Sequence, residues 1–333
     1  MGAMTSALDW LLDPADPGVR YLALRDLVPG TSATDLASAR RAAHTRGPIA
    51  TVLDAMEGPG FWAAAGPGYN PKYRSTVWSV VLLAQLGAHV DEDDRIARAC
   101  DYLLDHAMAP GGQFSGNGAP SGTVDCLHGN LCWALLALGV SAGRLGLTLD
   151  WLARSVTGDG ISPRTDRDAP VRYYAGKCGP GFACGSNDGL PCAWGAIKVM
   201  RALARWPEAE RTPIAGIAIE QGLEFLLAID PATAAYPTGY SAKPSRNWWK
   251  FGFPVFYISD ILEIVEVVAA LGHGRDPRLA NAIEAVIRKR ALDGTWALEY
   301  DYAGKTWIDV GPKGMPNKWV TLRALSALAA AGR

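Results

Sequence analysis

The 333-residue sequence predicts an all-α fold in which helices form an inner and an outer layer. Helical spacing of apolar residues covers most of the chain. Two kinds of helix occur along it: some have one apolar face, and others are apolar all round and must be buried on every side. Similar glycine-containing turns recur about every 50 residues in the first half of the chain, which is the length of one helix pair with its loops.

The expected helices follow one another with no strand pattern between them. Residues 94–104 and 277–290 are amphipathic, and in the latter Leu279, Ile283 and Val286 share one face. By contrast, residues 77–87 and 131–140 carry no charge. Together the patterns predict helices at about residues 18–28, 33–45, 48–56, 72–87, 93–106, 125–139, 147–155, 192–205, 211–228, 256–271, 277–290 and 317–331.

The turns between these helices repeat a motif of glycine with an aromatic or aliphatic residue. The motif occurs as Gly60-Phe61-Trp62, Gly112-Gln113-Phe114, Gly160-Ile161 and Asp293-Gly294-Thr295-Trp296. The longer gap between the last two leaves room for two further helix pairs and an insertion. Repeats of this period predict a closed or stacked helical array.

The turn Asp293–Trp296 resembles the Asp-Gly-x-Trp repeat of the squalene cyclase and prenyltransferase superfamily. Residues 69–78, 126–130 and 318–323 are similar to stretches of bacterial prenyltransferase and squalene oxidase repeat proteins. The resemblance extends from about residue 8 to residue 331. It implies one terpenoid cyclase-like (α/α)6 toroid over residues 1–333, with the inner helices starting around a central cavity, and it does not by itself assign a reaction.

Residues 157–191 form a long segment without helical period, rich in Gly, Pro, Asp and Arg. Loops of this length inside a compact domain usually form lids or sites. The segment also contains Cys178 and Cys184. We therefore expect it to fold over one mouth of the helical array.

Five of the six cysteines lie between residues 126 and 192. Thiolates and imidazoles are the ligands that zinc prefers. We predict a zinc site formed by Cys126, Cys178, Cys184 and Cys192, with His128 as a substitute ligand. Four protein ligands would make the site structural, whereas three and an open position would make it catalytic. The alternative is that these residues are buried free thiols.

Helix geometry limits this ligand set. Residues two apart on a helix point about 200° away from each other, since each residue advances ~100°. Cys126 and His128 can therefore bind one ion only if the helix starts later than residue 125. Zinc enzymes of the resembling fold include protein prenyltransferases, whose Asp, Cys and His ligands are similar in kind to Asp125, Cys126 and His128. Their Asp and Cys are two residues apart, however, and here the two are adjacent. Lanthipeptide cyclases have a Cys-His-Gly motif, into which this chain inserts Leu127.

The catalytic candidates lie at the starts of the expected inner helices. Of the five histidines, His128 alone occupies a helix start, where the helix dipole favours neutral imidazole and hence a ligand or general base. Asp125 is the second candidate base. Further polar groups that we expect at the cavity mouth are Tyr73, Arg74, Asp260 and Lys318. Arg74 and Lys318 could hold an oxyanion and Asp260 could orient them; alternatively, these groups form ion pairs between helices.

One acidic run matches the Asp-x-Asp-Asp motif of class II terpene cyclases. It spans residues 91–94 and stands just before the expected helix 93–106. Asp residues in that position cap helices and favour the first turn. We predict capping rather than catalysis for this motif.

Charge and composition bound the partners. A net charge of −1 with dispersed basic residues argues against nucleic acid and anionic membranes as partners. The apolar helices are too short to span a bilayer, and the first ten residues lack a signal-peptide pattern, so we expect a cytoplasmic protein. Twelve tryptophans make a small apolar or aromatic substrate the expected ligand. The oligomeric state stays open.

Three functions fit these observations. The first is a zinc-dependent enzyme that hydrolyses an apolar or aromatic ester or phosphoester through Lewis-acid chemistry. The second is a terpenoid or prenyl cyclase-like or transferase-like enzyme, which the fold resemblance implies. The third is a non-catalytic binding protein with a structural zinc.

Overall fold

The computed structural model of the chain is mostly helical, and it describes residues 6–161, 177–241 and 243–333. Its helices are α1 (Ala7–Leu11), α2 (Pro17–Leu27), α3 (Ala33–Thr45), α4 (Pro48–Asp54), α5 (Thr76–Gln85), α6 (Asp94–His106), α7 (Asp125–Ala137), α8 (Gly146–Thr157), α9 (Ala193–Arg205), α10 (Pro213–Leu227), α11 (Ile261–Val268), α12 (Ala280–Arg288) and α13 (Lys318–Ala330). Two short antiparallel strands, β1 (Cys178–Gly179) and β2 (Ala183–Cys184), form a ribbon before α9.

The predicted helices are confirmed, because each overlaps one of α2 to α13. The sequence patterns missed α1, which is only five residues long and shows no period. A capping box between Ser6 and Asp9 stabilises its first turn. Among the described helices, none combines the length and apolarity that a membrane crossing requires.

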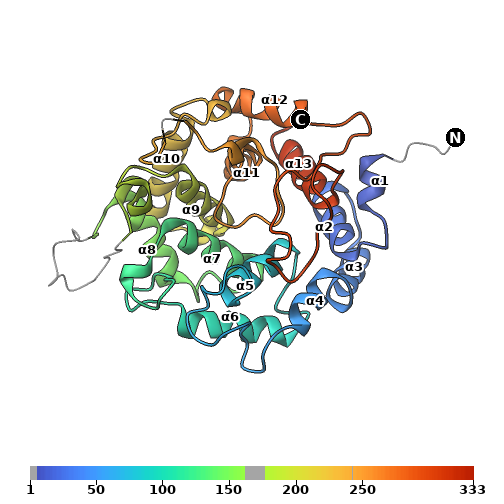
Figure 1. Cartoon of the computed structure of the whole chain (residues 1–333), viewed down its shortest axis with the longest axis horizontal. Helices are drawn as coiled ribbons and strands as arrows, with labels where there is room; N and C mark the ends of the chain where they lie inside the picture. The colour runs from blue at the N-terminus through green and yellow to red at the C-terminus, as the bar shows by residue number, and fades with distance from the viewer. Residues whose placement is uncertain (1–5, 162–176, 242) are drawn as a thin grey trace.

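Figure 1 shows that consecutive helices follow one another around a ring, with α5, α7, α9, α11 and α13 closer to the centre than α6, α8, α10 and α12. Along the inner circle α5 packs on α7, α7 on α9, α9 on α11 and α11 on α13. The last helix, α13, also packs on α2, so that the two ends of the chain close the ring. A Cβ added to Gly18 of α2 would lie 3.2 Å from the Trp319 ring of α13, which shows how tightly this junction fits.

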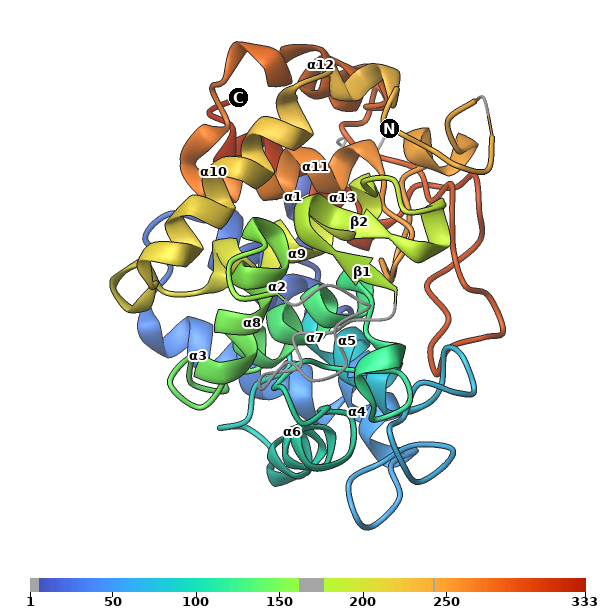
Figure 2. The ribbon, with the colours of Figure 1, turned by 90° about the vertical axis from the view of Figure 1, so that its left-hand side faces the viewer.

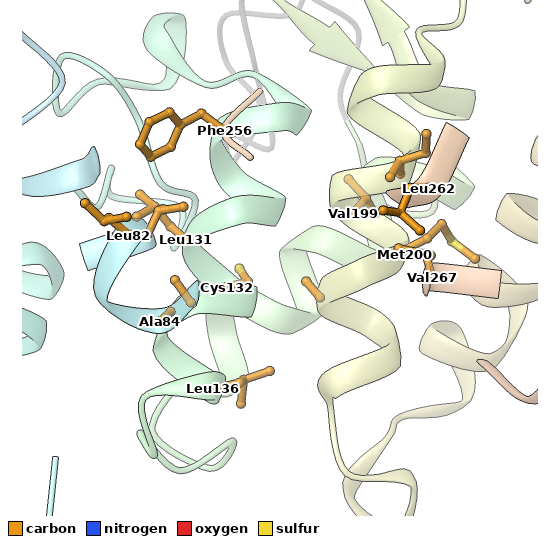
Figure 3. Packing of buried hydrophobic residues seen from close by; sticks show 14 of the residues in the cluster. Leu82, Ala84, Leu131, Cys132, Leu136, Val199, Met200, Phe256, Leu262 and Val267 are labelled. Atoms are coloured by element: carbon orange, nitrogen blue, oxygen red, sulfur yellow. The ribbon is translucent and has the colours of Figure 1, made fainter. Parts of the chain in front are cut away.

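Burial separates the two layers as the sequence predicts. All 10 residues of α5 are buried, whereas α6 buries one face formed by Ile96, Ala99, Cys100, Tyr102 and Leu103. The core between neighbouring inner helices consists of close-packed aliphatic side chains. Figure 3 shows Leu82 of α5 beside Leu131 of α7, and Val199 of α9 near Leu262 of α11.

The tightest helix pair of the ring is α7 with α9. Gly129 of α7 faces the backbone of α9, and a Cβ at this position would lie 2.5 Å from the carbonyl carbon of Lys198. No side chain fits such a gap, so a glycine allows the two helices to approach. The start of α7 and the start of α9 are thereby held close together.

Six charged residues form a network between α9, α11 and α13. The Lys198 ammonium contacts both carboxylate oxygens of Glu263 at 2.5 Å, and both side chains are fully buried. The remaining members share carboxylates in the same way: Arg201 contacts Glu263 (3.5 Å), and Arg323 contacts Asp260 (3.2 Å) and Glu266 (2.9 Å). Three positive and three negative charges thus neutralise one another inside the ring.

The repeated turns connect outer to inner helices with one hydrogen-bond pattern. In three of the four turns, the backbone N–H of the aromatic residue donates to a side chain in the first or second turn of the next inner helix: Trp62 to Thr76 Oγ1 (3.2 Å), Phe114 to His128 Nδ1 (3.0 Å) and Trp296 to Thr321 Oγ1 (3.0 Å). In the fourth turn the Ile161 N–H donates to Gly158 O instead. The Trp62 and Trp296 indoles also donate to the preceding helix, at Val52 O (2.7 Å) and Val286 O (2.8 Å). The predicted repeat is therefore a repeat of hydrogen bonding as well as of sequence.

The cap predicted for the acidic run at residues 91–94 is confirmed. Asp93 precedes α6 and its side chain accepts a hydrogen bond from the Arg95 N–H at 2.9 Å. The same carboxylate pairs with the Arg95 guanidinium at 2.8 Å. The acidic run at residues 91–94 therefore serves a helix start on the outer layer.

The turn pattern leads to a stability prediction. Thr321→Val keeps the side-chain shape but removes the acceptor for the buried Trp296 N–H. We expect the free energy of unfolding to fall by about 1–3 kcal/mol, the usual cost of leaving a buried donor unpaired. Guanidinium chloride denaturation measures this, with the exposed Thr45→Val as control. An unchanged midpoint for Thr321→Val would contradict the structural role of the repeated hydrogen bond.

Candidate functional site

A cavity of about 900 Å³ opens at one end of the ring, where the inner helices begin. Its lining includes Lys72 just before α5, Cys126 in the first turn of α7, Trp194 in the first turn of α9 and Tyr257 shortly before α11. Helix N-termini carry a partial positive charge from the aligned peptide dipoles. In the side view of Figure 2 the long connecting segments and the β1–β2 ribbon gather toward one side of the molecule.

The described part of the long loop forms one wall of this cavity. Lys177, Cys184 and Ser186 all line it. Asn187 attaches this wall to the segment opposite, because its Nδ2 donates to Pro237 O (3.1 Å) and its Oδ1 accepts from the Gly239 N–H (3.1 Å). Residues 162–176 of the loop predicted at 157–191 lie outside the described residues.

Aromatic rings give the cavity its apolar surface. The polar tips of two of them are already bonded to backbone: Tyr236 O–H donates to Leu226 O (2.6 Å) and Trp248 Nε1–H donates to Pro231 O (2.8 Å). Both residues line the cavity together with Trp194, although Tyr236 is only 8% and Trp248 only 2% exposed. Such a wall favours an apolar or aromatic ligand.

Positive charge is the second feature of the lining. Four cationic side chains, Lys72, Lys177, Lys243 and Arg246, contribute to it. Within the parts of the chain that the structure describes, the lining contains no Asp or Glu. The chain as a whole has 32 basic and 33 acidic residues, so this bias is local to the cavity.

The structure brings the four predicted metal-ligating cysteines to one place. Cys126, Cys184 and Cys192 line the cavity, and Cys178 pairs with Cys184 across the β1–β2 ribbon. All four are free thiols. A hydrogen bond from the Cys192 thiol, with the backbone N–H groups at residues 186 and 187, lowers the pKa of Cys184 to about 6. Burial instead raises the pKa of Cys126 to about 12.

Asp125 lies directly behind these thiols. It is the first residue of α7, and Val124 rather than Asp125 occupies the N-cap position. Its carboxyl group contacts the Cys178 thiol, and its Oδ1 has no hydrogen-bond partner among the described residues. Burial, together with the charge of Cys184, raises the pKa of Asp125 to about 7. Asp125 is therefore a buried carboxyl group whose pKa lies well above its ordinary value.

Four thiols with an adjacent carboxyl group are donors of the kind that zinc binds. Within residues 6–161, 177–241 and 243–333, no group of three His, Cys, Asp or Glu side chains is placed so that it could hold a metal ion. Zinc binding by Cys126, Cys178, Cys184 and Cys192 stays a prediction from the sequence.

His128 does not join the cysteines. Because α7 begins at Asp125, Cys126 and His128 point to different sides of the helix. The imidazole is fully buried, with Nδ1 accepting from the Phe114 N–H and Nε2 donating to Thr148 O (3.2 Å). Burial lowers its pKa to about 3, so that the ring is neutral. In place of the expected base or ligand, the structure has a histidine in the position that Thr76 and Thr321 occupy in the other repeats.

The remaining expected residues lie around the cavity or away from it. Arg74 packs over the Trp307 ring at 5.3 Å, Asp260 caps α11 and pairs with Arg323, and Lys318 pairs with Asp13 and Asp16 beside α1. None of these three lines the cavity. Tyr73 is buried, and its hydroxyl lies 3.0 Å from the hydroxyl of Tyr257, which does line the cavity. The ion-pair alternative therefore describes Asp260 and Lys318 correctly.

Sequence reasoning did not select the cationic residues that line the cavity. Lys72 stands inside the stretch 69–78 that carries the family resemblance, between two tyrosines in sequence. The two nearby tyrosines are the sequence feature that could have pointed to Lys72 as a site residue. Lys177, Lys243 and Arg246 come from loops without a motif, and only folding places them around one cavity.

The chain matches no protein-family model and no curated protein. Among solved structures it is similar to the type II terpene cyclase MstE from Scytonema, with 13% identity, coverage of 89% of this chain and 98% of that chain, and a TM-score of 0.31. An MstE variant in complex with geranylgeranyl dihydroxybenzoate gives 14% identity, coverage of 88% and 97%, and a TM-score of 0.32. A protein from Actinoplanes gives 16% identity, coverage of 88% and 100%, and a TM-score of 0.32.

The neutral, buried state of His128 leads to a pH prediction. The pKa of His128 is about 3 in the folded protein against an ordinary value of 6.5, so the unfolded chain binds one more proton between these values. The contribution of His128 to the free energy of unfolding is fully present above pH ~6.5. As the pH is lowered toward ~3, this contribution falls by at most about 1.4 kcal/mol per pH unit. His128→Gln keeps a donor and an acceptor but does not titrate. In this variant we expect the free energy of unfolding to fall less steeply with decreasing pH, by up to that amount per pH unit. Urea denaturation at a series of pH values measures it, and parallel curves for the two proteins would contradict it.

The thiol cluster leads to a prediction about metal content. If the four cysteines bind zinc, protein purified without added metal contains close to one zinc per chain, and Cys126→Ala loses it because a ligand is gone. His128→Gln, by contrast, retains the wild-type zinc content. Elemental analysis of the three proteins decides between these outcomes. Absence of zinc from the wild type, with the thiols open to alkylation, would leave buried free thiols as the correct interpretation.

Proposed function

We propose that the ring of helices is an (α/α)6 toroid and that the protein is an enzyme of the terpenoid cyclase or prenyltransferase type, acting on an elongated apolar substrate. The observation that carries this proposal is the cavity of about 900 Å³ at the starts of the inner helices, walled by Trp194, Tyr236, Trp248 and Tyr257. Its size lies within the range of cavities that enclose most of a small-molecule ligand.

The chemistry of the walls supports this class of reaction. Rearrangement of a prenyl chain proceeds through electron-poor carbon centres, and the faces of aromatic rings stabilise positive charge. Tyr236 and Trp248 bond their polar tips to backbone, and with Trp194 and Tyr257 they supply the aromatic part of the cavity lining. An apolar wall also limits the water that would quench a reactive intermediate.

A second candidate function is zinc-dependent hydrolysis of an apolar ester. The observation in its favour is that Cys126, Cys184 and Cys192 line the same cavity. A zinc ion held there would supply Lewis-acid activation of a carbonyl or phosphoryl oxygen. Binding of an apolar ligand without turnover is the third outcome that an assay distinguishes.

We expect the purified protein to convert at least one member of a panel of prenyl substrates and not to hydrolyse aromatic esters. The panel comprises prenyl phosphates, prenyl diphosphates and prenylated aromatic acids of increasing chain length, with products identified by mass spectrometry. Trp194→Ala removes one wall of the cavity, and we expect it to lower kcat/KM by roughly 10- to 100-fold, since a large aromatic contact contributes about 1.5–3 kcal/mol.

Leu292→Ala is the matched control, because this side chain is fully exposed and outside the cavity. It should leave kcat/KM unchanged. Ester hydrolysis that is lost with a chelator and restored by zinc would support the second candidate instead. Tight binding of prenyl compounds without any product would identify a binding protein.

A further inference from the structure

We infer that Cys184 and Cys192 form a redox-active pair, in which a hydroperoxide that enters the cavity converts the two thiols to a disulfide. The pair lies in the wall of the cavity, next to the β1–β2 ribbon. Its chemistry requires neither the proposed reaction nor a bound metal ion. The wall of the cavity therefore contains a reversible modification site in addition to its aromatic rings.

The backbone around Cys184 is paired on both sides. On one side, Cys184 of β2 lies opposite Cys178 of β1. On the other side, the segment before α9 runs antiparallel to β2: the Cys184 N–H donates to Leu190 O (3.1 Å), and the Cys192 N–H donates to Phe182 O (2.9 Å). Cys184 thus has one cysteine on each of its two neighbouring segments.

The side-chain contacts select Cys192 as the partner of Cys184. The Cys192 thiol donates a hydrogen bond to the Cys184 sulfur. The Cys178 thiol instead contacts the carboxyl group of Asp125. Because the sulfur atoms of Cys184 and Cys192 are already neighbours, a disulfide between them needs rotation of side chains rather than a large movement of the backbone.

The segment that joins the two cysteines is held in place by its own hydrogen bonds. The buried Asn187 side chain donates through Nδ2 to Leu190 O (3.3 Å) and Pro191 O (3.0 Å). The Gly189 N–H donates to Cys184 O (2.9 Å). These bonds fix the backbone on both sides of the pair in the reduced protein, so that each thiol stays within reach of the other.

Both members of the pair are accessible to a small oxidant. Cys184 and Cys192 are partly exposed and line the cavity, whereas Cys100 and Cys132 are buried in the helical core. Cys178 does not belong to the described lining. Exposure and a second thiol nearby are the features that distinguish redox-active cysteines from inert ones.

Oxidation of the pair by hydrogen peroxide proceeds in two steps. The sulfur of the first thiol attacks one peroxide oxygen and loses its proton; the O–O bond breaks, and a sulfenic acid and one water form. The sulfur of the second thiol then attacks the sulfenic sulfur, the S–O bond breaks, and the hydroxyl leaves as a second water with the proton of that thiol. Each sulfur loses one electron, and the peroxide is reduced to water.

Peroxide treatment of the reduced full-length protein tests the pair. Free thiols are then blocked with iodoacetamide in denaturant, disulfides are reduced, and the released thiols are labelled with N-ethylmaleimide. We expect the thiols open to iodoacetamide to fall from six to four, and dithiothreitol to restore all six. Trypsin cleavage at Lys177 and Lys198 leaves Cys178, Cys184 and Cys192 on one peptide, so fragment-ion spectra must locate the maleimide labels. We expect them on Cys184 and Cys192.

Single variants separate the pair from the rest of the thiol cluster. In Cys184→Ser and in Cys192→Ser we expect no maleimide label, because one partner is gone, and the remaining sulfenic acid is captured by dimedone. Cys178→Ser is the matched control: it removes the cysteine on the other side of Cys184. This variant should form the disulfide at the same peroxide concentration as the wild type. Equal circular dichroism of all the proteins shows that folding is unchanged.

Several results would overturn the inference. One is a maleimide label on Cys178 or Cys126 in the wild type, because the disulfide would then join a different pair. Another is six thiols still open to iodoacetamide at a peroxide concentration that oxidises N-acetylcysteine. A third is close to one zinc per chain in the untreated protein, with the cluster protected from peroxide until a chelator is added. Each of these results would leave the proposed function standing, since that function is tested by turnover of prenyl substrates.

Discussion

The buried charge network between α9, α11 and α13 is the constraint on which the inner ring depends. Lys198 and Glu263 are fully buried, and isolated charges in that position would cost several kcal/mol each. They are tolerated because each is paired: burial alone would raise the pKa of Glu263, yet Lys198, Arg201 and Arg323 hold it below its ordinary value. Such pairing exists only when the three helices keep one mutual placement. Trp194 at the start of α9 and Tyr257 before α11 take their positions in the cavity from that placement.

A second, local interaction attaches the outer helices to this ring: the hydrogen bond between an aromatic turn and the next inner helix. In the three turns with an aromatic residue, a backbone N–H points into the core, and a side chain of the next inner helix accepts its hydrogen bond. Thr76 and His128 serve the same purpose with different chemistry, because a hydroxyl oxygen and an unprotonated imidazole nitrogen both accept a hydrogen bond. This equivalence explains why a histidine at the start of a helix, a natural candidate for catalysis, is here part of the architecture.

The described lining of the cavity combines aromatic rings, free thiols and four cationic side chains. Cys184 is the one thiol of the cluster whose pKa falls to about 6, because the Cys192 thiol and the backbone N–H groups at residues 186 and 187 form hydrogen bonds with it. Cys184 lines the same cavity as Trp194 and Trp248.

The sequence by itself determined the helices, their order and their two layers. The spacing of apolar residues shows which face of a helix is buried, and the absence of charged residues from α5 shows that this helix is buried on every side. It also indicated that Cys126, Cys178, Cys184 and Cys192 come together. It could not place Lys72, Lys243 and Arg246 at one cavity, since loop residues follow no period and meet only when the ring closes. Nor could it separate His128 from the cysteines, because that depended on the residue at which α7 begins. Orientation around a helix and the convergence of distant loops are decided by packing, and packing exists only in the tertiary structure.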